Sequence, residues 1–229
     1  MKKFFDLNLI NHYLDKYSIS EYFDENIKKL INIFIFKQNE NIISKGMDFN
    51  YFYFFVEGKL KIYTLEKNGK SLLLRFYKPL EVLGDAELFR TNKYKTYVDS
   101  TQNSILLGID IKNFENYLKN NSDMLIFIIK NLSQKLDSLS NLSSFNLLYP
   151  LKNRFAGYLK GMGLQDNYVY NEIKADNLKE ISELLGTSYR HLLRIVNEFE
   201  RNNYIINNRG KIKILNYEKI NELSMGVYE

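Results

Sequence analysis

The chain contains no cysteine and no tryptophan, and only two histidines and two prolines occur in its 229 residues. Without cysteine it cannot form a disulfide, a thiolate zinc site or a cysteine-ligated iron–sulfur cluster. The two histidines, His12 and His191, lie far apart in the sequence, which argues against a histidine-rich metal site. We therefore expect a protein that uses neither a metal ion nor a cofactor.

Long apolar runs are also absent. The densest one, residues 124–129, is far shorter than the roughly 20 residues that a membrane-spanning helix needs. The N-terminus begins with a basic segment, but Asp6, Asn8 and Asn11 interrupt any apolar core, so we do not expect it to be a signal peptide. These features predict a cytoplasmic protein without membrane contact. The net charge of +5 is compatible with a polyanionic partner but does not identify one.

Residues 31–109 alternate short runs of β-branched and aromatic residues with turn signals, a pattern typical of strands. Asn68-Gly69 predicts a type I′ hairpin turn between two of them. Residues 1–30 show helical spacing instead. The segment therefore predicts a β-barrel or jelly roll, with strands over residues 33–36, 51–56, 60–65, 71–77 and 104–109.

A long helix is expected over residues 121–149, because Asn121-Ser122 offers an N-cap and no further proline occurs before Pro150. This helix can pack on the chain's own β domain, or it can form the seam of a parallel coiled-coil dimer. Periodicity alone leaves both alternatives open. The stripe at three- and four-residue spacing that carries either contact comprises Leu125, Ile128, Leu132, Leu136, Leu139 and Leu142.

Residues 150–229 carry the pattern of a helix-turn-helix. Helices are expected over residues 151–161, 176–186 and 188–202, followed by hairpin strands at 203–207 and 211–215. Gly186 permits a tight turn, and Ser188 can cap the helix that follows. In a helix-turn-helix this second helix enters the major groove of DNA, although an ordinary helical hairpin has the same pattern.

Charge favours the DNA-binding interpretation. Six basic and two acidic residues give residues 187–213 a net charge of +4, against +5 for the whole chain. Tyr189, Arg190 and Arg194 are the candidates for reading bases, because the first turns of a recognition helix reach base edges and arginine can bind guanine bidentately. Phosphate contacts, which position a protein without specifying sequence, are expected from Asn177, Lys179, Thr187, Ser188 and Arg209.

Four local motifs resemble the Crp/Fnr family of bacterial regulators: IISKG (42–46), FFVEGKL (54–60), NGK (68–70) and LGDAELF (83–89). Residues 188–194 are similar to the YeiL-like branch of that family. The resemblance implies an α+β fold, with an N-terminal antiparallel β-roll over residues 1–120, a dimerisation helix over 121–149 and a winged helix-turn-helix over 150–229. It also implies a homodimer that binds a palindromic site on double-stranded DNA and contacts RNA polymerase.

The effector site is where the resemblance weakens. In the cyclic-nucleotide members of the family, a Gly-Glu pair opens a short helix and holds the ribose, and an Arg-Ser pair holds the cyclic phosphate. Here Gly84-Asp85, followed by Ala86, and Lys95-Thr96 stand at these places. Aspartate is one methylene shorter, and lysine lacks the bidentate fork that suits phosphate. We therefore expect an effector other than cyclic AMP: an unidentified small molecule, a partner protein, or none if the pocket is vestigial.

Two other functions compete with this one. A barrel enzyme of the cupin type would need clustered metal ligands, commonly histidines, and the barrel segment contains no histidine. A ligand-binding module could use its C-terminal helices for protein contacts, although the clustered charge argues against it. The sequence predicts a sequence-specific transcription regulator rather than an enzyme.

Overall fold

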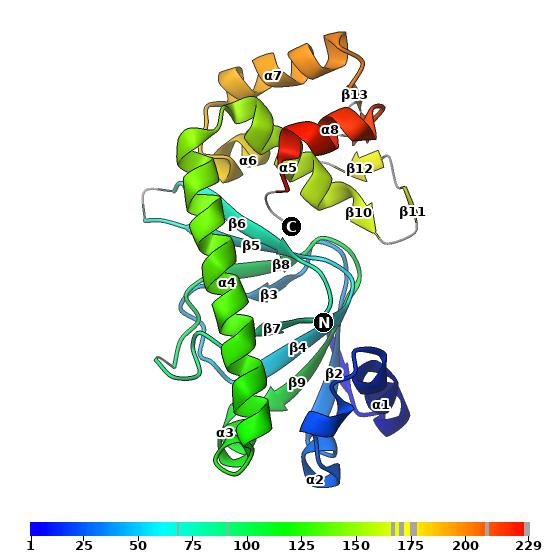
Figure 1. Cartoon of the computed structure of the whole chain (residues 1–229), viewed down its shortest axis with the longest axis vertical. Helices are drawn as coiled ribbons and strands as arrows, with labels where there is room; N and C mark the ends of the chain where they lie inside the picture. The colour runs from blue at the N-terminus through cyan, green and yellow to red at the C-terminus, as the bar shows by residue number, and fades with distance from the viewer. Residues whose placement is uncertain are drawn as a thin grey trace. The chain divides into compact units, whose positions relative to one another are not determined.

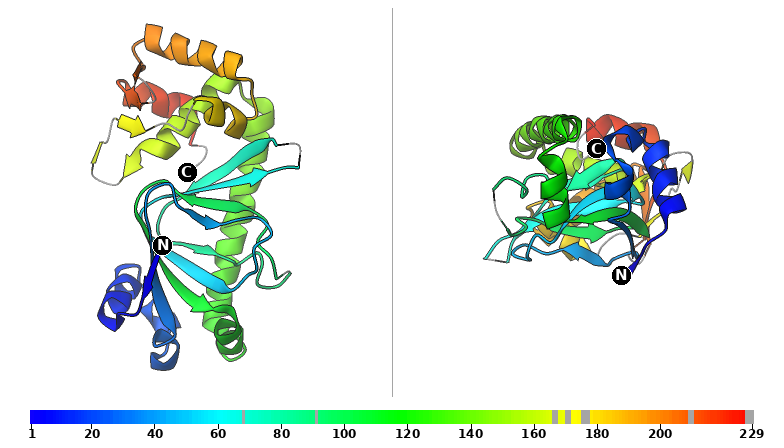
Figure 2. Two further views of the ribbon diagram at one scale, coloured as in Figure 1. Left: turned by 180° about the vertical axis from the view of Figure 1, so that it is seen from behind. Right: turned by 90° about the horizontal axis from the view of Figure 1, so that it is seen from below.

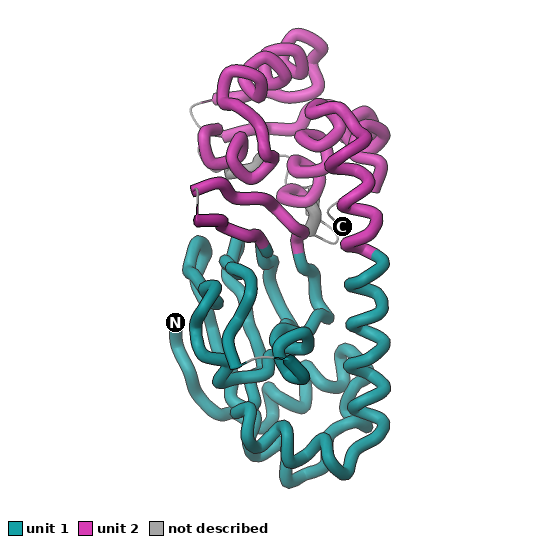
Figure 3. Tube along the Cα trace, turned by 90° about the vertical axis from the view of Figure 1, so that its left-hand side faces the viewer, with its two compact units in different colours: residues 1–62, 77–137 teal, residues 63–76, 138–229 magenta. Residues whose placement is uncertain are grey.

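The computed structural model describes residues 1–67, 69–90, 92–165, 168–169, 172–174, 178–208 and 211–226, and it describes side chains outside residues 164–177. Two compact units make up the chain (Figure 3). The first comprises residues 1–62 and 77–137, and the second comprises residues 63–76 and 138–229. The long helix α4 (Ser122–Leu148) contributes to both units, so the boundary between them falls within this helix.

The first unit begins with a strand that the sequence did not predict. The helical elements expected within residues 1–30 follow it. In chain order, the elements are β1 (Lys2–Phe4), α1 (Leu7–Lys16), the 3-10 turn η1 (Ser20–Tyr22) and α2 (Glu25–Lys28). The Asp6 side chain caps α1 by accepting a hydrogen bond from the Leu9 N–H at 3.0 Å. Ile10 and Leu14 are fully buried, which fixes α1 beside the β2 end of the β-roll (Figures 1 and 2).

Two antiparallel sheets form the β-roll, in the orders β1-β2-β9-β4-β7 and β3-β8-β5-β6. All five expected strands are present, together with three short ones that the pattern did not reveal. The strands are β2 (Ile31–Phe36), β3 (Asn41–Ile43), β4 (Tyr51–Glu57), β5 (Leu60–Leu65), β6 (Ser71–Tyr77), β7 (Glu81–Leu83), β8 (Tyr97–Ser100) and β9 (Ser104–Asp110).

Strand β4 is buried on both faces, because five consecutive residues, 52–56, are all buried. Helices cover one of these two faces. The Phe52 ring lies 4.3 Å, centroid to centroid, from Phe114 of α3 (Ile111–Leu118), a helix that sequence reasoning missed. The Phe54 ring stacks at 6.4 Å on Phe127 of α4. The dense aromatic run is thus the centre of the roll's core.

The hairpin between β5 and β6 differs from the expected type I′ turn. The Glu66 N–H bonds the Lys70 carbonyl at 2.8 Å, and the Gly69 N–H bonds the Glu66 carbonyl at 2.9 Å. Three residues therefore lie in the loop rather than two, and such a loop needs a single left-handed residue, the position of Gly69 at φ +77°. Asn68 lies outside the described residues.

Among its described residues, the second unit contains four further helices and a three-stranded sheet in the order β12-β14-β13. Its core gathers residues such as Phe155, Ile181, Leu192 and Ile212, all fully buried. The expected hairpin is present, with Asn208 opposite Lys211, and α8 was not expected. The elements are α5 (Leu151–Gly163), β10 (Leu164–Gln165), β11 (Tyr168–Val169), β12 (Glu172–Lys174), α6 (Leu178–Leu184), α7 (Tyr189–Arg201), β13 (Ile205–Asn208), β14 (Lys211–Ile214) and α8 (Tyr217–Ser224).

Candidate nucleic-acid interface and effector pocket

Helices α6 and α7 are joined by a tight turn over residues 185–188. Gly186 adopts φ +60° in this turn, a conformation that glycine reaches without the steric cost of a side chain. The Ser188 Oγ accepts a hydrogen bond from the His191 N–H at 3.2 Å and caps α7. The turn and the N-cap expected from the sequence are confirmed, and α7 begins at Tyr189.

Helix α7 has a sharply divided surface. Leu192, Val196 and Phe199 are buried in the second unit. The opposite face is polar and exposed, and Tyr189 at its start is 48% exposed. Four side chains at spacings of four, three and four residues share this face, which we call the reading stripe: Arg190, Arg194, Asn197 and Arg201.

Asn197 and Arg201 extend the set of candidates that the sequence suggested. An asparagine can bind adenine bidentately in the major groove, and Asn197 lies one turn beyond Arg194. The Arg201 Nε–H bonds the Asn197 backbone carbonyl at 3.2 Å. The helical spacing of both residues from Arg190 could have revealed them in the sequence.

Contacts at the preceding turn, on the buried face and at the far end help to position α7. An Arg154 Nη1–H donates to the backbone carbonyl of Leu185, where α6 meets the turn. The Phe155 and Phe199 rings pack with centroids 5.5 Å apart. At the far end of α7, the Glu200 carboxylate accepts the Asn207 N–H of β13 at 2.9 Å, which ties α7 to the hairpin of β13 and β14.

The candidate phosphate contacts lie on both sides of the turn. Lys179 and Ser188 are exposed, and Thr187 is half-buried with its hydroxyl 3.4 Å from the His191 Nδ1. Asn177 and Arg209 lie outside the described residues. On β14, Lys211 and Lys213 are exposed and alternate with buried isoleucines, so the wing presents two further cations on one side.

The expected effector residues lie in the first unit. Gly84 adopts φ +99°, and a Cβ there would lie 2.4 Å from the Phe49 Cε2, so no other residue fits without a shift. Residues 85–90 form turns and not the short helix that the resemblance implied. Asp85 is buried, and its carboxylate accepts a hydrogen bond from the Lys135 Nζ of α4 at 2.8 Å.

The second pair, Lys95 and Thr96, is not arranged as a phosphate clamp. The Lys95 side chain is exposed, whereas its backbone N–H donates to the buried Glu87 carboxylate at 3.1 Å. Burial raises the pKa of Glu87 and is only partly opposed by the Lys95 hydrogen bond. Ala86 is exposed and Thr96 half-buried. The pocket therefore directs acidic side chains inward and its lysine outward.

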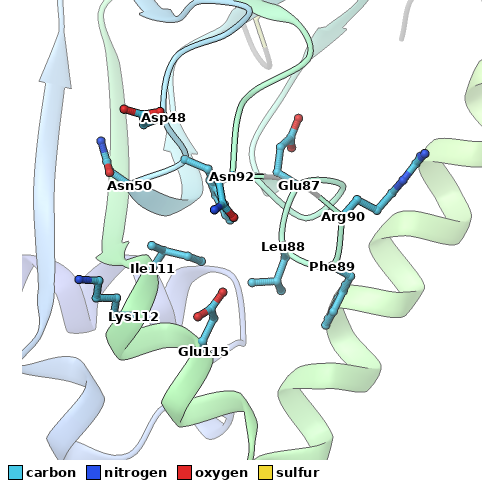
Figure 4. Close-up of a pocket in the computed structure, with 11 residues that line it drawn as sticks. Asp48, Asn50, Glu87, Leu88, Phe89, Arg90, Asn92, Ile111, Lys112 and Glu115 are labelled. Carbon is cyan, nitrogen blue, oxygen red and sulfur yellow. The ribbon is translucent and has the colours of Figure 1, made fainter.

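A separate pocket of about 610 Å³ opens between the turn after Gly84, the segment before β4 and helix α3 (Figure 4). Acidic and basic side chains line it together, so no single ligand charge is favoured. Glu115 points towards the pocket and Arg90 extends away from it (Figure 4). The charged lining residues are Asp48, Glu87, Arg90, Lys112 and Glu115.

The predicted stripe on α4 is divided between two faces. Ile128 and Leu142 are buried in the chain's own core, Leu125 and Leu132 are half-buried, and Leu136 and Leu139 are exposed. Two of the six predicted residues are therefore buried in the chain's own core. The positions of α4 that face this core precede the more exposed positions by one residue. Ile129, which was not in the predicted stripe, is exposed.

Within the described residues, no helix is both long and apolar enough to cross a membrane. The same part of the chain contains no group of three His, Asp or Glu side chains that could hold a metal ion.

Comparison with known proteins agrees with this geometry. Residues 34–121 match the family described as the cyclic nucleotide-binding domain. The regulatory protein YeiL of Escherichia coli O157:H7 is 24% identical over 195 residues, which cover 84% of this chain and 85% of that protein. The cAMP-activated global transcriptional regulator CRP of Haemophilus influenzae is 22% identical over 169 residues, 72% of this chain and 75% of that protein.

Among solved structures, a CRP/FNR-family transcriptional regulator from Thermus thermophilus superposes with a TM-score of 0.69 at 21% identity, covering 85% of this chain and 98% of the other. The chain has the fold of the Crp/Fnr regulators. The α+β fold and the family resemblance predicted from the sequence motifs are thereby confirmed. Within this Crp/Fnr fold, the departure at Asp85 and Lys95 is accompanied by the Lys135 contact.

Proposed function

We propose that the chain is a sequence-specific DNA-binding transcription regulator that acts in the cytoplasm as a homodimer on a palindromic operator. The observation that carries this proposal is the reading stripe: three arginines and an asparagine on the exposed face of a capped helix, beside a wing with two exposed lysines. Such a face can bind base edges and phosphates together.

A dimer is supported by a stripe of half-buried and exposed apolar residues on α4. Leu125, Ile129, Leu132, Leu136 and Leu139 follow one another at spacings of four and three residues, the a and d pattern of a coiled coil. Leucines occupy the three d positions, and Ile129 and Leu136 occupy the a positions. Isoleucine at a with leucine at d favours two parallel strands. We propose this set, with Ile129 in place of Ile128 and Leu142, as the dimer seam.

The effector, if there is one, is not cyclic AMP in this proposal. Asp85, the counterpart of the ribose-binding glutamate, is bound by Lys135, and the Lys95 side chain faces solvent. Contact with RNA polymerase is proposed from the resemblance, since regulators of this type act on transcription initiation. An unidentified small-molecule effector would have to bind by other contacts.

DNA binding can be tested by selecting operator fragments from the host genome and measuring affinity by fluorescence anisotropy over a range of salt concentrations. Because phosphate contacts release counterions, the logarithm of the affinity should fall steeply and linearly with the logarithm of the salt concentration. No selected fragment, or binding that does not respond to salt, would contradict the proposal and favour a module for protein contacts.

Arg194→Ala tests the reading stripe. Loss of a bidentate guanine contact should cost about 1–3 kcal/mol on the operator, roughly a 5- to 150-fold loss, and should relax one base position. Lys37→Ala, which removes an exposed cation from the first unit, is the control and should leave binding unchanged. Equal losses by Arg194→Ala on operator and random DNA would show that Arg194 binds only phosphate. Cyclic AMP or cyclic GMP added to wild type should change nothing, and a tenfold gain would overturn the effector proposal.

A further inference from the structure

Lys135 occupies an unusual place on α4. The buried face of this helix follows Met124, Ile128, Asn131 and Lys135 at spacings of four, three and four residues. The first two are fully buried apolar residues, and the Asn131 side chain donates a hydrogen bond to the Phe127 carbonyl at 2.9 Å. A lysine then stands where an apolar residue would continue the packing, and its side chain is only 13% exposed.

The Lys135 ammonium is bound on several sides. It donates to the Val82 carbonyl at 2.6 Å and to the Asp85 Oδ2 at 2.8 Å. The Glu81 Oε2 lies 4.0 Å away, and the Tyr77 ring centroid lies 5.0 Å from the Nζ. These partners come from β6, from β7 and from the turn that follows β7. One side chain of α4 therefore contacts three consecutive parts of the β-roll.

The charges of this cluster are well matched to an ammonium. Burial alone would lower the pKa of Lys135, but Tyr77, Asp85 and Glu81 outweigh burial and raise it, so the side chain stays charged. Asp85 and Glu81 are themselves 5% and 17% exposed. A cyclic phosphate entering here would meet these two carboxylates and the nearby Glu87, and it would have to displace the ammonium from Asp85.

Stability is not a sufficient explanation for such a pair. The desolvation of two buried charges can exceed their attraction, and apolar substitutes are often equally stable. A hydrogen-bonded ammonium does, however, specify a position, because it must reach particular oxygen atoms. Lys135 directly precedes Leu136 of the proposed seam, so fixing the rotation of α4 at Lys135 also fixes the direction in which that seam faces.

We propose that the Lys135 ammonium acts as a built-in substitute for an effector: bound to Asp85 and Val82, it holds α4 in the rotation that the DNA-binding dimer requires, so that operator binding needs no added ligand. This inference rests on the proposed function. Lys135 is a positioning residue here, since it acts on DNA only through the dimer seam.

Chemical rescue distinguishes this role from ordinary packing. Lys135→Ala removes the equivalent of n-propylamine from the protein, so n-propylammonium chloride can refill the cavity with an ammonium. We expect Lys135→Ala and Lys135→Met to weaken operator binding at least tenfold, and n-propylammonium to restore binding by Lys135→Ala at least partly. Sodium chloride at the same ionic strength should not restore it, and Lys130→Met, on the exposed side of the same helix, should bind as the wild type does.

Dimer dissociation constants measured alongside should rise for both Lys135→Ala and Lys135→Met, and n-propylammonium should lower the constant of Lys135→Ala only. If Lys135→Ala does not fold, Asp85→Asn carries the same expectation with a smaller loss, because the amide keeps an oxygen acceptor but not the charge. Wild-type affinity in folded Lys135→Met, or a loss that sodium chloride restores as well as the amine does, would overturn the inference. Wild-type protein that binds no operator would instead contradict the proposed function itself.

Discussion

Leu136→Ala provides a quantitative test of the proposed dimer seam. Leu136 is 69% exposed in the protomer. Full burial of a leucine side chain contributes about 1.5–3 kcal/mol, so covering the exposed part contributes about 1–2 kcal/mol per copy. Two copies meet in a symmetric dimer, which makes about 2–4 kcal/mol in all. At 1.4 kcal/mol per tenfold, the dimer dissociation constant should rise roughly 30- to 700-fold.

Leu142→Ala is the matched control, with the same substitution on the same helix. Leu142 is only 7% exposed because it packs in the core of the second unit. Its truncation should lower the free energy of unfolding by about 2–5 kcal/mol, as for other core leucines, and leave dimer dissociation nearly unchanged. Sedimentation equilibrium would measure dissociation, and urea unfolding at concentrations that keep the protein monomeric would measure stability. The reasoning fails if Leu142→Ala weakens the dimer while Leu136→Ala does not.

Two further predictions concern single polar contacts. Arg154→Met removes the donor to the Leu185 carbonyl and should lower the free energy of unfolding by about 1.5–3 kcal/mol in urea titrations; a variant as stable as the wild type would show that this contact does not hold the turn before α7. Glu87→Gln keeps an acceptor for the Lys95 N–H but removes a carboxylate whose pKa burial raises. A raised pKa means that the folded protein disfavours the ionised carboxylate, which is the form present at neutral pH. The uncharged variant should therefore melt higher than the wild type at neutral pH. This advantage should shrink as the pH falls through that raised pKa, and an advantage that grows on acidification would contradict the assignment.

Much of the fold could be predicted because local patterns agree with the tertiary packing. The aromatic run of β4, the cap at Asn121 and the Gly186 turn each carry a strong local signal. Short elements escaped prediction for a physical reason: α3 buries only Phe114 and Leu118, too few apolar residues to show a period. Strand β1 depends on pairing with β2 rather than on its own composition, which includes two lysines.

Much of the proposed reading stripe was also predictable, since the first turns of α7 and their charges are visible in the sequence. Asn197 was missed because no charge marks it, although its spacing from Arg194 places it on the same face. The seam on α4 could not be settled by periodicity, because stripes one residue apart have identical spacing. Burial in the chain's own core separates Ile128 from Ile129, and only a three-dimensional structure supplies that information.

Lys135 shows why substitutions in a pocket cannot be interpreted one by one. Taken alone, Asp85 and Lys95 indicate that a cyclic phosphate would bind weakly, which leaves an unused pocket. The α4 contact changes that conclusion, because a shorter carboxylate leaves room for an ammonium and Lys135 supplies it at 2.8 Å. The same helix turns Leu136 towards the proposed partner, about 100° around the axis from Lys135. A change at the pocket that rotates α4 would therefore also move the proposed seam, so the proposed effector independence and the proposed dimer geometry both depend on one buried contact.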